Sequence, residues 1–170
     1  MANSVLVGIV MGSASDWPSL EPAAALLKEW SIGVEVTVAS AHRAPKRVLA
    51  YAREAAGRGL KVIIAAAGAA AHLAGVIAAE TTLPVIGVPL PSSDLKGLDS
   101  LLSTVQMPAG VPVATMALGS AGAKNAAIFA AQILALSDQR LKEILKGHKQ
   151  LLEQKVVQQG EQIPPEYRGT

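Results

Sequence analysis

The sequence predicts an α/β fold in which a parallel sheet carries helices on both faces and an extra helix follows at the C-terminal end. Apolar, often β-branched runs alternate with segments of helical character, which is the pattern of βαβ units. Turn and helix-start signals follow the runs directly. With 170 residues, 51% of them hydrophobic, the chain has the length of one domain with a substantial core.

Five apolar runs are the expected strands, and they cover residues 5–11, 34–39, 62–67, 84–88 and 112–116. Connections between parallel strands are almost always right-handed, so the carboxyl ends of these strands share one edge of the sheet. Open parallel sheets bind their ligands in the crevice outside that edge. We therefore expect the loops that follow the strands to face a common crevice.

The first two helices have clear start signals. Asp16 is placed to cap the first helix, with Pro18 in its first turn, and this helix should end at about Trp30. Pro45 opens the second helix, which should end near the glycines at 57 and 59. The third strand leads into a loop of small residues, whose backbone N–H groups a ligand can approach closely.

The second half of the chain is predicted to alternate strands and helices less regularly. Residues 89–110 should hold a short helix between irregular stretches, and residues 119–122 a loop before an alanine-rich helix over 123–136. Apolar residues at helical spacing then form a stripe on a last helix: Leu141, Ile144, Leu145, Leu151, Leu152 and Val156. This stripe can pack on the chain's own sheet or on a neighbouring subunit, and since the sheet already has enough helices to cover it, we favour a subunit contact. Residues 1–158 are thus expected to form one domain that includes an oligomerisation helix, and residues 159–170 a polar tail.

The composition excludes several classes of function. Fifteen Lys and Arg face 13 Asp and Glu, interspersed along the chain, and only two Trp, two Tyr and one Phe are present, so we expect no nucleic-acid partner. The absence of cysteine excludes disulfides, thiolate nucleophiles and iron–sulfur clusters. The uncharged run 62–79 is about long enough to span a bilayer, but it is rich in Ala and Gly, so we interpret it as a buried strand and a helix start. No positive region precedes the first apolar run, and we expect a cytoplasmic protein without membrane contact.

The loop after the first strand is a candidate anion site. Its sequence, Gly-Ser-Ala-Ser-Asp over 12–16, offers hydroxyl and N–H groups at a helix N-terminus, where the helix dipole favours an anion. It matches neither GxxxxGK[ST] nor GxGxxG, so triphosphate hydrolysis and standard dinucleotide binding lack their signatures. A phosphate cradle and ordinary turn or capping chemistry both remain open. Asp16 either caps the helix or accepts hydrogen bonds from ribose hydroxyls.

His42 and Arg43 place a titratable base beside a fixed cation at a strand end, where Arg43 can share an anionic ligand with the first loop. A lone loop histidine is more commonly a surface or capping residue, and only converging loops weaken that interpretation. His72, among Ala and Gly, is equally suited to ligand contact and to backbone hydrogen bonding. His148 lies on the last helix, where we expect a structural role. Without carboxylates at ligand spacing these histidines make a poor metal site, so we predict no metal.

Longer motifs resemble those of the PurE family. Met-Gly-Ser-x-Ser-Asp-Trp begins at Met11 and Ser-Ala-His-Arg-x-Pro at Ser40. Further matching segments are residues 62–65, 70–73, 83–89, 99–103, 105–113 and 122–127. The resemblance covers about residues 5–136, and motifs this long and ordered are highly specific. It implies a three-layer flavodoxin-like, or Rossmann-like, fold and a homo-octamer with sites at subunit boundaries.

The resemblance also implies an activity, that of an N5-carboxyaminoimidazole ribonucleotide mutase in de novo purine synthesis. Such an enzyme moves a carboxyl group from the exocyclic nitrogen to C4 of the aminoimidazole ring, through carbon dioxide trapped in a closed site. His42 would handle the C4 proton, a role that suits an imidazole. Ser13 and Arg43 fall on phosphate contacts and Asp16 on a ribose contact. The other substrate-site positions are Ser15, Ser40, Gly68, Ala70, His72 and Leu73. The resemblance implies no metal, nucleotide or organic cofactor.

The third loop departs from the family pattern, which usually reads Gly-Ala-Gly-Gly-Ala-Ala-His-Leu-Pro-Gly. Here Ala66, Ala69 and Ala74 replace two glycines and the proline. If a replaced glycine needs positive φ, alanine at that position costs about 1 kcal/mol and shifts the loop. Three other functions stay open: an aminoimidazole ribonucleotide carboxylase that uses dissolved carbon dioxide directly, a noncatalytic flavodoxin-like phospholigand-binding module, and a scaffold whose third loop has drifted out of function. The segment 70–73 favours the mutase over the carboxylase.

Overall fold

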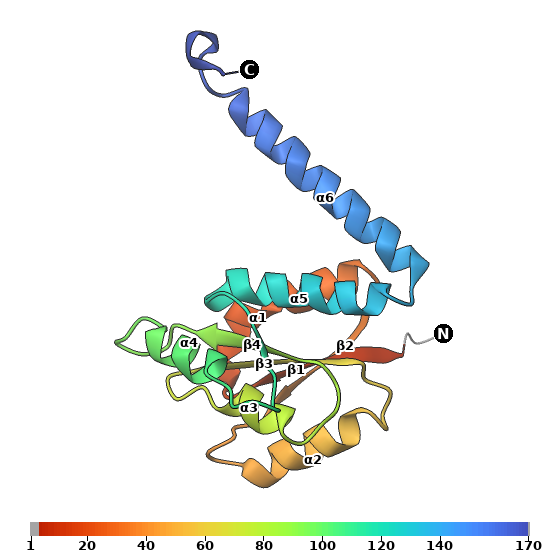
Figure 1. The fold of residues 1–170 in the computed structure, drawn as a ribbon, viewed down its shortest axis with the longest axis vertical. Coiled ribbons are helices and arrows are strands. Elements are labelled where there is room, and N and C mark those ends of the chain that lie inside the picture. Colours follow the sequence, from red (N-terminus) through yellow and green to blue (C-terminus); the bar gives the residue numbers. More distant parts are fainter. Residues whose placement is uncertain (1–3, 170) are drawn as a thin grey trace.

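The computed structural model describes residues 4–169, which form a five-stranded parallel sheet between two layers of helices (Figure 1). The strands are β1 (Val5–Met11), β2 (Gly33–Val38), β3 (Val62–Gly68), β4 (Val85–Leu90) and β5 (Ala114–Thr115). Their order in the sheet is β2-β1-β3-β4-β5, the order of flavodoxin-like folds. The strand order reverses its direction between β1 and β3, because β2 lies on one side of β1 and β3 to β5 follow on the other. Flavodoxin-like folds bind their ligands at this switch point. The predicted α/β class and flavodoxin-like arrangement are confirmed.

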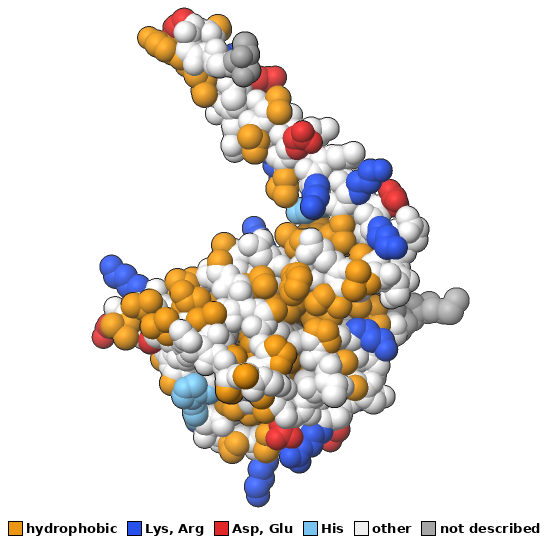
Figure 2. Space-filling view, viewed as in Figure 1, with side chains coloured by type: hydrophobic (Ala, Val, Ile, Leu, Met, Phe, Trp, Pro, Cys, Tyr) orange, Lys and Arg blue, Asp and Glu red, His pale blue; other side chains and the backbone are white. Residues whose placement is uncertain are grey.

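The helices divide between the two faces of the sheet. One face carries α1 (Trp17–Glu29) and α5 (Gly119–Ala135), and the other carries α2 (Pro45–Ala55), α3 (Leu73–Ala78) and α4 (Leu98–Val105). The last helix, α6 (Gln139–Gly160), packs on α5 and then projects from the body, with hydrophobic side chains along its length (Figure 2). Short 3₁₀ turns lie at Ala14–Asp16 and Pro165–Tyr167. Within residues 4–169, no helix is both long enough and apolar enough to cross a membrane.

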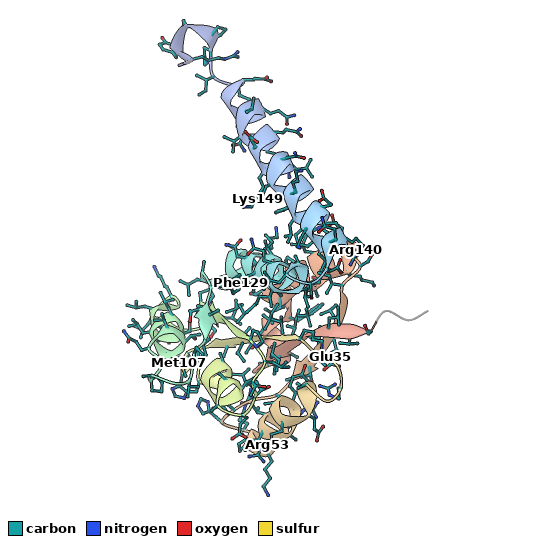
Figure 3. All side chains as sticks on the ribbon, turned by 45° about the vertical axis from the view of Figure 1, so that its right-hand side comes forward. Glu35, Arg53, Met107, Phe129, Arg140 and Lys149 are labelled. Carbon is teal, nitrogen blue, oxygen red and sulfur yellow. The ribbon has the colours of Figure 1, made fainter. Side chains whose placement is uncertain are left out.

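The core consists of two apolar layers, because successive strand residues point to opposite faces. On β3, for example, Ile64 packs toward α1 and α5, whereas Ile63 packs toward α2 and α3. Side chains from both helix layers meet the sheet in this way (Figure 3). The face of α5 toward the sheet is made of alanines, and those fully buried are Ala123, Ala126, Ala127, Ala130 and Ala131. Small side chains let α5 lie close to α1 and to strands β3 and β4.

Two elements differ from the prediction for identifiable reasons. The alanine-rich helix begins at Gly119 rather than at 123, because the glycines there permit close packing and do not mark a loop. A Cβ atom on Gly122 would lie 1.6 Å from the carbonyl oxygen of Ala117. The fifth strand is only Ala114–Thr115 instead of 112–116, and Pro112 has no N–H group with which to extend its ladder.

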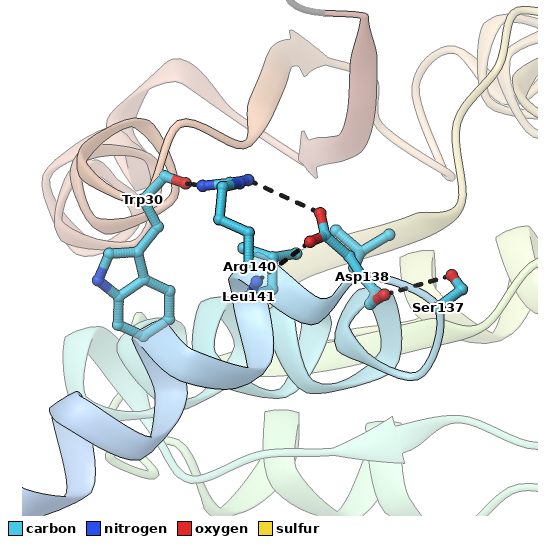
Figure 4. A network of polar contacts seen from close by, with 6 residues as sticks. Trp30, Ser137, Asp138, Arg140 and Leu141 are labelled. Atoms are coloured by element: carbon cyan, nitrogen blue, oxygen red, sulfur yellow. Dashed lines mark hydrogen bonds and ion pairs between the residues drawn. The ribbon is translucent and has the colours of Figure 1, made fainter.

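The start of α6 is anchored to the body by polar contacts (Figure 4). The carboxylate of Asp138 accepts a hydrogen bond from the N–H of Leu141 at 3.2 Å and so caps the helix. Arg140 donates to the carbonyl of Trp30 at 2.8 Å, and the Leu141 side chain is buried. Further along α6, His148 packs edge-on against the Trp30 ring, with the ring centroids 5.2 Å apart. This contact agrees with the structural role expected for His148.

Candidate active site

The loop after β1 folds back on itself through its own polar side chains. The Ser13 hydroxyl accepts hydrogen bonds from the N–H and the hydroxyl of Ser15, at 3.3 and 2.8 Å. The Asp16 carboxylate accepts from the N–H of Ser13 at 3.0 Å, which completes a capping box around the 3₁₀ turn. Asp16 occupies the N-cap position of α1, as expected, but its side chain makes no capping hydrogen bond to that helix. The carboxylate instead closes the 3₁₀ turn that Ser13 caps.

Arg43 joins the loop after β2 to the loop after β1. Its guanidinium donates to the carbonyl of Gly12 at 2.9 Å and, through Nε, to the Ser40 hydroxyl at 3.4 Å. The side chain is exposed, so the rest of its charged fork faces solvent beside the first loop. A permanent positive charge is thus fixed next to the hydroxyl and N–H groups of Ser13 and Ser15.

Asp16 is half-buried, and its environment disfavours the charged form. Desolvation raises the pKa of its carboxyl above the ordinary value of 3.8, although the hydrogen bond from Ser13 and the charge of Arg43 act in the opposite direction. A half-buried carboxylate at the cavity wall is suited to accept hydrogen bonds from ligand hydroxyls, because a ligand that pairs with it offsets its lost hydration.

His42 and His72 form a pair across two loops. The Nε2 atom of His42 lies 2.9 Å from the Nδ1 atom of His72, and the rings meet edge to face with centroids 5.0 Å apart. His42 follows β2, whereas His72 directly precedes α3. Such a hydrogen bond needs one protonated and one bare ring nitrogen, so the pair shares a proton. This side-chain contact could not be predicted from the sequence, because spacing along the chain does not reveal which way a loop side chain points.

These loops enclose a cavity of about 340 Å³ at the carboxyl edge of the sheet, within the size range of small-molecule sites. Nine of the ten residues expected at the site line it: Ser13, Ser15, Asp16, Ser40, His42, Arg43, Gly68, Ala70 and Leu73. The tenth, His72, reaches the cavity through its bond to His42. Sequence reasoning missed Ser92, which follows β4 and also lines the cavity. The strand-end rule applied to the other loops points to Ser92 as well.

A larger hollow of about 540 Å³ lies between α1 and β2. Its wall is mostly apolar, and its charged side chains, Glu21 and Lys28, belong to one helix. We favour the smaller cavity as the functional site, because polar groups from several loops converge there and do not converge in the larger hollow. Among residues 4–169, no group of three or more His, Asp or Glu side chains is placed to hold a metal ion.

Comparison with known proteins identifies the family. The family described as AIRC, AIR carboxylase, matches residues 6–155. The chain belongs to this AIR carboxylase family. A family member from Pseudomonas aeruginosa, named N5-carboxyaminoimidazole ribonucleotide mutase, is 59% identical over 143 residues, which are 84% of this chain and 88% of that protein. A Bacillus subtilis member of the same name is 52% identical over 158 residues, which are 93% of this chain and 98% of that protein.

A solved structure is also similar to this chain. The crystal structure of Treponema denticola PurE superimposes with a TM-score of 0.82 at 29% sequence identity, covering 93% of this chain and 98% of that one. The resemblance to the PurE family that the motifs indicated is thereby confirmed, and so is the fold that it implied.

The third loop shows which departure from the usual family motif matters. Ala69 adopts φ of +51°, in the left-handed region, where a side chain is disfavoured. Ala66 lies in regular pairing within β3, between Met11 and Val88. Ala74 is buried in α3, and alanine favours the helical backbone conformation. Of the three replacements, only Ala69 holds a backbone conformation for which glycine is better suited.

Ala69→Gly should therefore stabilise the protein by about 1 kcal/mol, because glycine adopts the left-handed conformation without steric cost. Ala66→Gly is the matched control and should destabilise it by about 0.5–1 kcal/mol, because glycine weakens a strand interior. Urea unfolding at one fixed protein concentration measures both changes. Loss of stability in both variants would contradict the assignment of strain to Ala69.

Asp16→Asn should be more stable than the wild type near neutral pH. The raised pKa means that the folded state disfavours the ionised carboxylate, and this cost is present above the folded-state pKa and disappears as the pH falls below 3.8. The stability difference between the two proteins should therefore shrink as the pH is lowered toward 3.8 in a series of urea titrations. A difference that grows on acidification would show that the carboxylate stabilises the fold.

Proposed function

We propose that this chain is an N5-carboxyaminoimidazole ribonucleotide mutase, an isomerase of de novo purine synthesis. The relatives from Pseudomonas aeruginosa and Bacillus subtilis carry this name at 59% and 52% identity over most of the chain. The observation that carries the proposal is that the His42–His72 pair adjoins the same cavity as Arg43 and the first loop. A single ligand can therefore reach a phosphate cradle and a proton carrier at the same time.

Binding energy comes from the non-reacting parts of the nucleotide. The phosphate accepts hydrogen bonds from Arg43 and from the Ser13 hydroxyl, which Ser15 orients, where a fixed cation meets the N-terminal end of the 3₁₀ turn. Asp16 accepts from the ribose hydroxyls, and Ser40 orients Arg43 through the bond to its Nε atom. These contacts hold the aminoimidazole ring against the remaining wall, formed by Gly68, Ala70 and Leu73, and this positioning lowers the entropic part of the barrier. Among these wall residues, Ala70 has a small side chain, which suits a wall that must admit carbon dioxide beside the ring.

The reaction takes up one proton and releases one proton. Loss of carbon dioxide from the exocyclic nitrogen leaves an amine that takes up a proton, and addition of the same carbon dioxide at C4 releases the C4 proton. His42 handles this proton at the cavity, and His72 accepts or returns it through their shared hydrogen bond. The cycle closes without a metal, nucleotide or organic cofactor, because no electron or external group is transferred.

Purified protein assayed without ATP or added metal tests the proposal. Conversion of N5-carboxyaminoimidazole ribonucleotide at low bicarbonate supports the mutase. Activity seen only with aminoimidazole ribonucleotide at high bicarbonate would replace it with a carboxylase that uses carbon dioxide directly. Binding of either nucleotide with no turnover of either would favour a noncatalytic phospholigand-binding module.

His42→Asn should lower kcat by at least about a hundredfold, because it removes the proton carrier from the cavity. The dissociation constant for 4-carboxy-5-aminoimidazole ribonucleotide should change little, since the phosphate and ribose contacts are intact. Steady-state kinetics and calorimetry measure the two effects separately. Wild-type turnover in this variant would exclude His42 from the chemistry, and loss of binding would give it a structural role instead.

The domain of residues 1–158 assembles as a homo-octamer in this proposal, with residues 159–170 as a polar tail. Support comes from the apolar side chains that α6 exposes beyond its anchored start: Leu151, Leu152, Val156 and Val157 are 49–67% exposed. Such a face is typical of a subunit contact. The proposal also places the enzyme in the cytoplasm, without a nucleic-acid or membrane partner. The interspersed charges and few aromatic side chains support the absence of a nucleic-acid partner.

The double variant Leu152→Glu, Val156→Glu should dissociate the assembly, because it places two like charges on the apolar stripe of α6. Lys149→Glu, an exposed site on the same helix, is the matched control and should leave the assembly intact. Sedimentation velocity should give the wild type eight times the 17.4 kDa mass of one chain. A monomeric wild type, or an octameric double variant, would contradict the role of α6.

A further inference from the structure

Ser92 lines the cavity from the loop after β4, and the proposed mechanism assigns no role to this loop. It follows Leu90, the last residue of β4, and Leu90 pairs with Gly68 at the end of β3. Ser92 is exposed and lines the same cavity as His42 and Arg43. The β4 loop therefore contributes a hydroxyl to a site otherwise built from the loops after β1, β2 and β3.

The Ser92 side chain is seated against the backbone of the third loop. A Cβ atom built on Gly68 would lie 1.7 Å from the Oγ atom of Ser92 and 2.7 Å from its Cβ atom. The serine hydroxyl therefore occupies the space that any side chain at position 68 would fill. Gly68 serves the site by admitting this hydroxyl to the cavity wall.

The Ser92 hydroxyl differs from the other serine hydroxyls of the cavity in its partners. Those of Ser13 and Ser15 bond to each other, and that of Ser40 accepts hydrogen bonds from Arg43. Within the described residues, the Oγ atom of Ser92 makes no hydrogen bond, and only its backbone N–H is bonded, to Leu90. Its full capacity to donate and accept is available to a ligand.

The position of Ser92 along the sheet indicates which part of the ligand it meets. The proposed phosphate contacts, Ser13 and Arg43, follow β1 and β2, and β4 lies two strands from β1. Two interstrand spacings amount to about 10 Å, a distance suited to the span between the phosphate and the far side of the base in a nucleotide. His42 follows β2, but its ring bonds to His72 on the loop after β3, and Ser92 lies against Gly68 at the end of β3. Ser92 is therefore on the side of the cavity assigned to the reacting ring and its carboxyl group.

The charges of the cavity wall favour the carboxyl group as the partner. Arg43 is the one Lys or Arg side chain among the described residues that line the cavity, and it serves the phosphate. A carboxylate beside the ring lies away from that cation, and the His42–His72 pair is engaged in handling the proton. The Ser92 hydroxyl is then the free side-chain donor available to the carboxylate. A neutral donor also suits a carboxylate that leaves as uncharged carbon dioxide, because a fixed cation would stabilise the ground state against that loss.

We propose that the Ser92 hydroxyl donates a hydrogen bond to the carboxylate of the substrate and of the product, and so distinguishes carboxylated nucleotides from aminoimidazole ribonucleotide. This inference rests on the proposed function. It makes Ser92 a specificity-determining residue, and it gives Gly68 a defined reason for lacking a side chain.

Ser92→Ala tests the proposal, with Ser93→Ala as the matched control. The Ser93 hydroxyl accepts from the N–H of Leu95 at 3.2 Å, and Ser93 does not line the cavity. Calorimetry measures the binding of 4-carboxy-5-aminoimidazole ribonucleotide and of aminoimidazole ribonucleotide to both variants and to the wild type. Ser92→Ala should weaken the carboxylated ligand by about tenfold to a hundredfold, the loss expected for a hydrogen bond to a charged group. Binding of the ligand without the carboxylate should stay unchanged, and Ser93→Ala should bind both ligands as the wild type does.

Equal weakening of both ligands by Ser92→Ala would overturn the proposal, because it would indicate a general effect on the loop. Unchanged binding of both would overturn it as well. A wild type that binds the carboxylated nucleotide without converting N5-carboxyaminoimidazole ribonucleotide would refute the mutase while the binding comparison still decides the role of Ser92. A wild type that binds neither nucleotide would refute both.

Discussion

The parallel pairing of β1 with both β2 and β3 is the constraint on which the site depends. Met11, the last residue of β1, pairs with Val38 on one side and with Ala66 on the other. The three strands therefore end at nearly the same level, and their loops meet over one edge. The bonds of Arg43 and His42 then tie these loops together, so the apolar core that fixes the strands also fixes the relative positions of the polar groups.

In the proposed mechanism, the position of Arg43 in the cavity separates substrate binding from the chemical step. Arg43 lies at the end of the cavity assigned to the phosphate, which does not react. Strong interactions there position the ring without stabilising either form of the carboxyl group. The reacting end is lined by small and neutral groups and by the His42–His72 pair. This division suits a reaction in which a carboxylate must become carbon dioxide and then a carboxylate again.

The sequence predicted the strands and the convergence of their loops well, because β-branched runs followed by Gly, Ser, His and Pro carry strong local signals. It predicted tertiary contacts poorly. Gly119 and Gly122 resemble a loop but belong to a helix that packs closely on Ala117. The left-handed conformation of Ala69 and the position of Ser92 against Gly68 depend on how loops meet in space, which no spacing encodes.

The proposed function requires one cavity to hold a nucleotide with its phosphate at Arg43 and its reacting ring at His42. The decisive experiment is a crystal structure with 4-carboxy-5-aminoimidazole ribonucleotide bound. Phosphate oxygens should then lie within hydrogen-bond distance of Arg43 and Ser13, and C4 of the ring beside the imidazole of His42. A ligand bound in the hollow between α1 and β2, or bound with its phosphate at the histidines, would refute this arrangement.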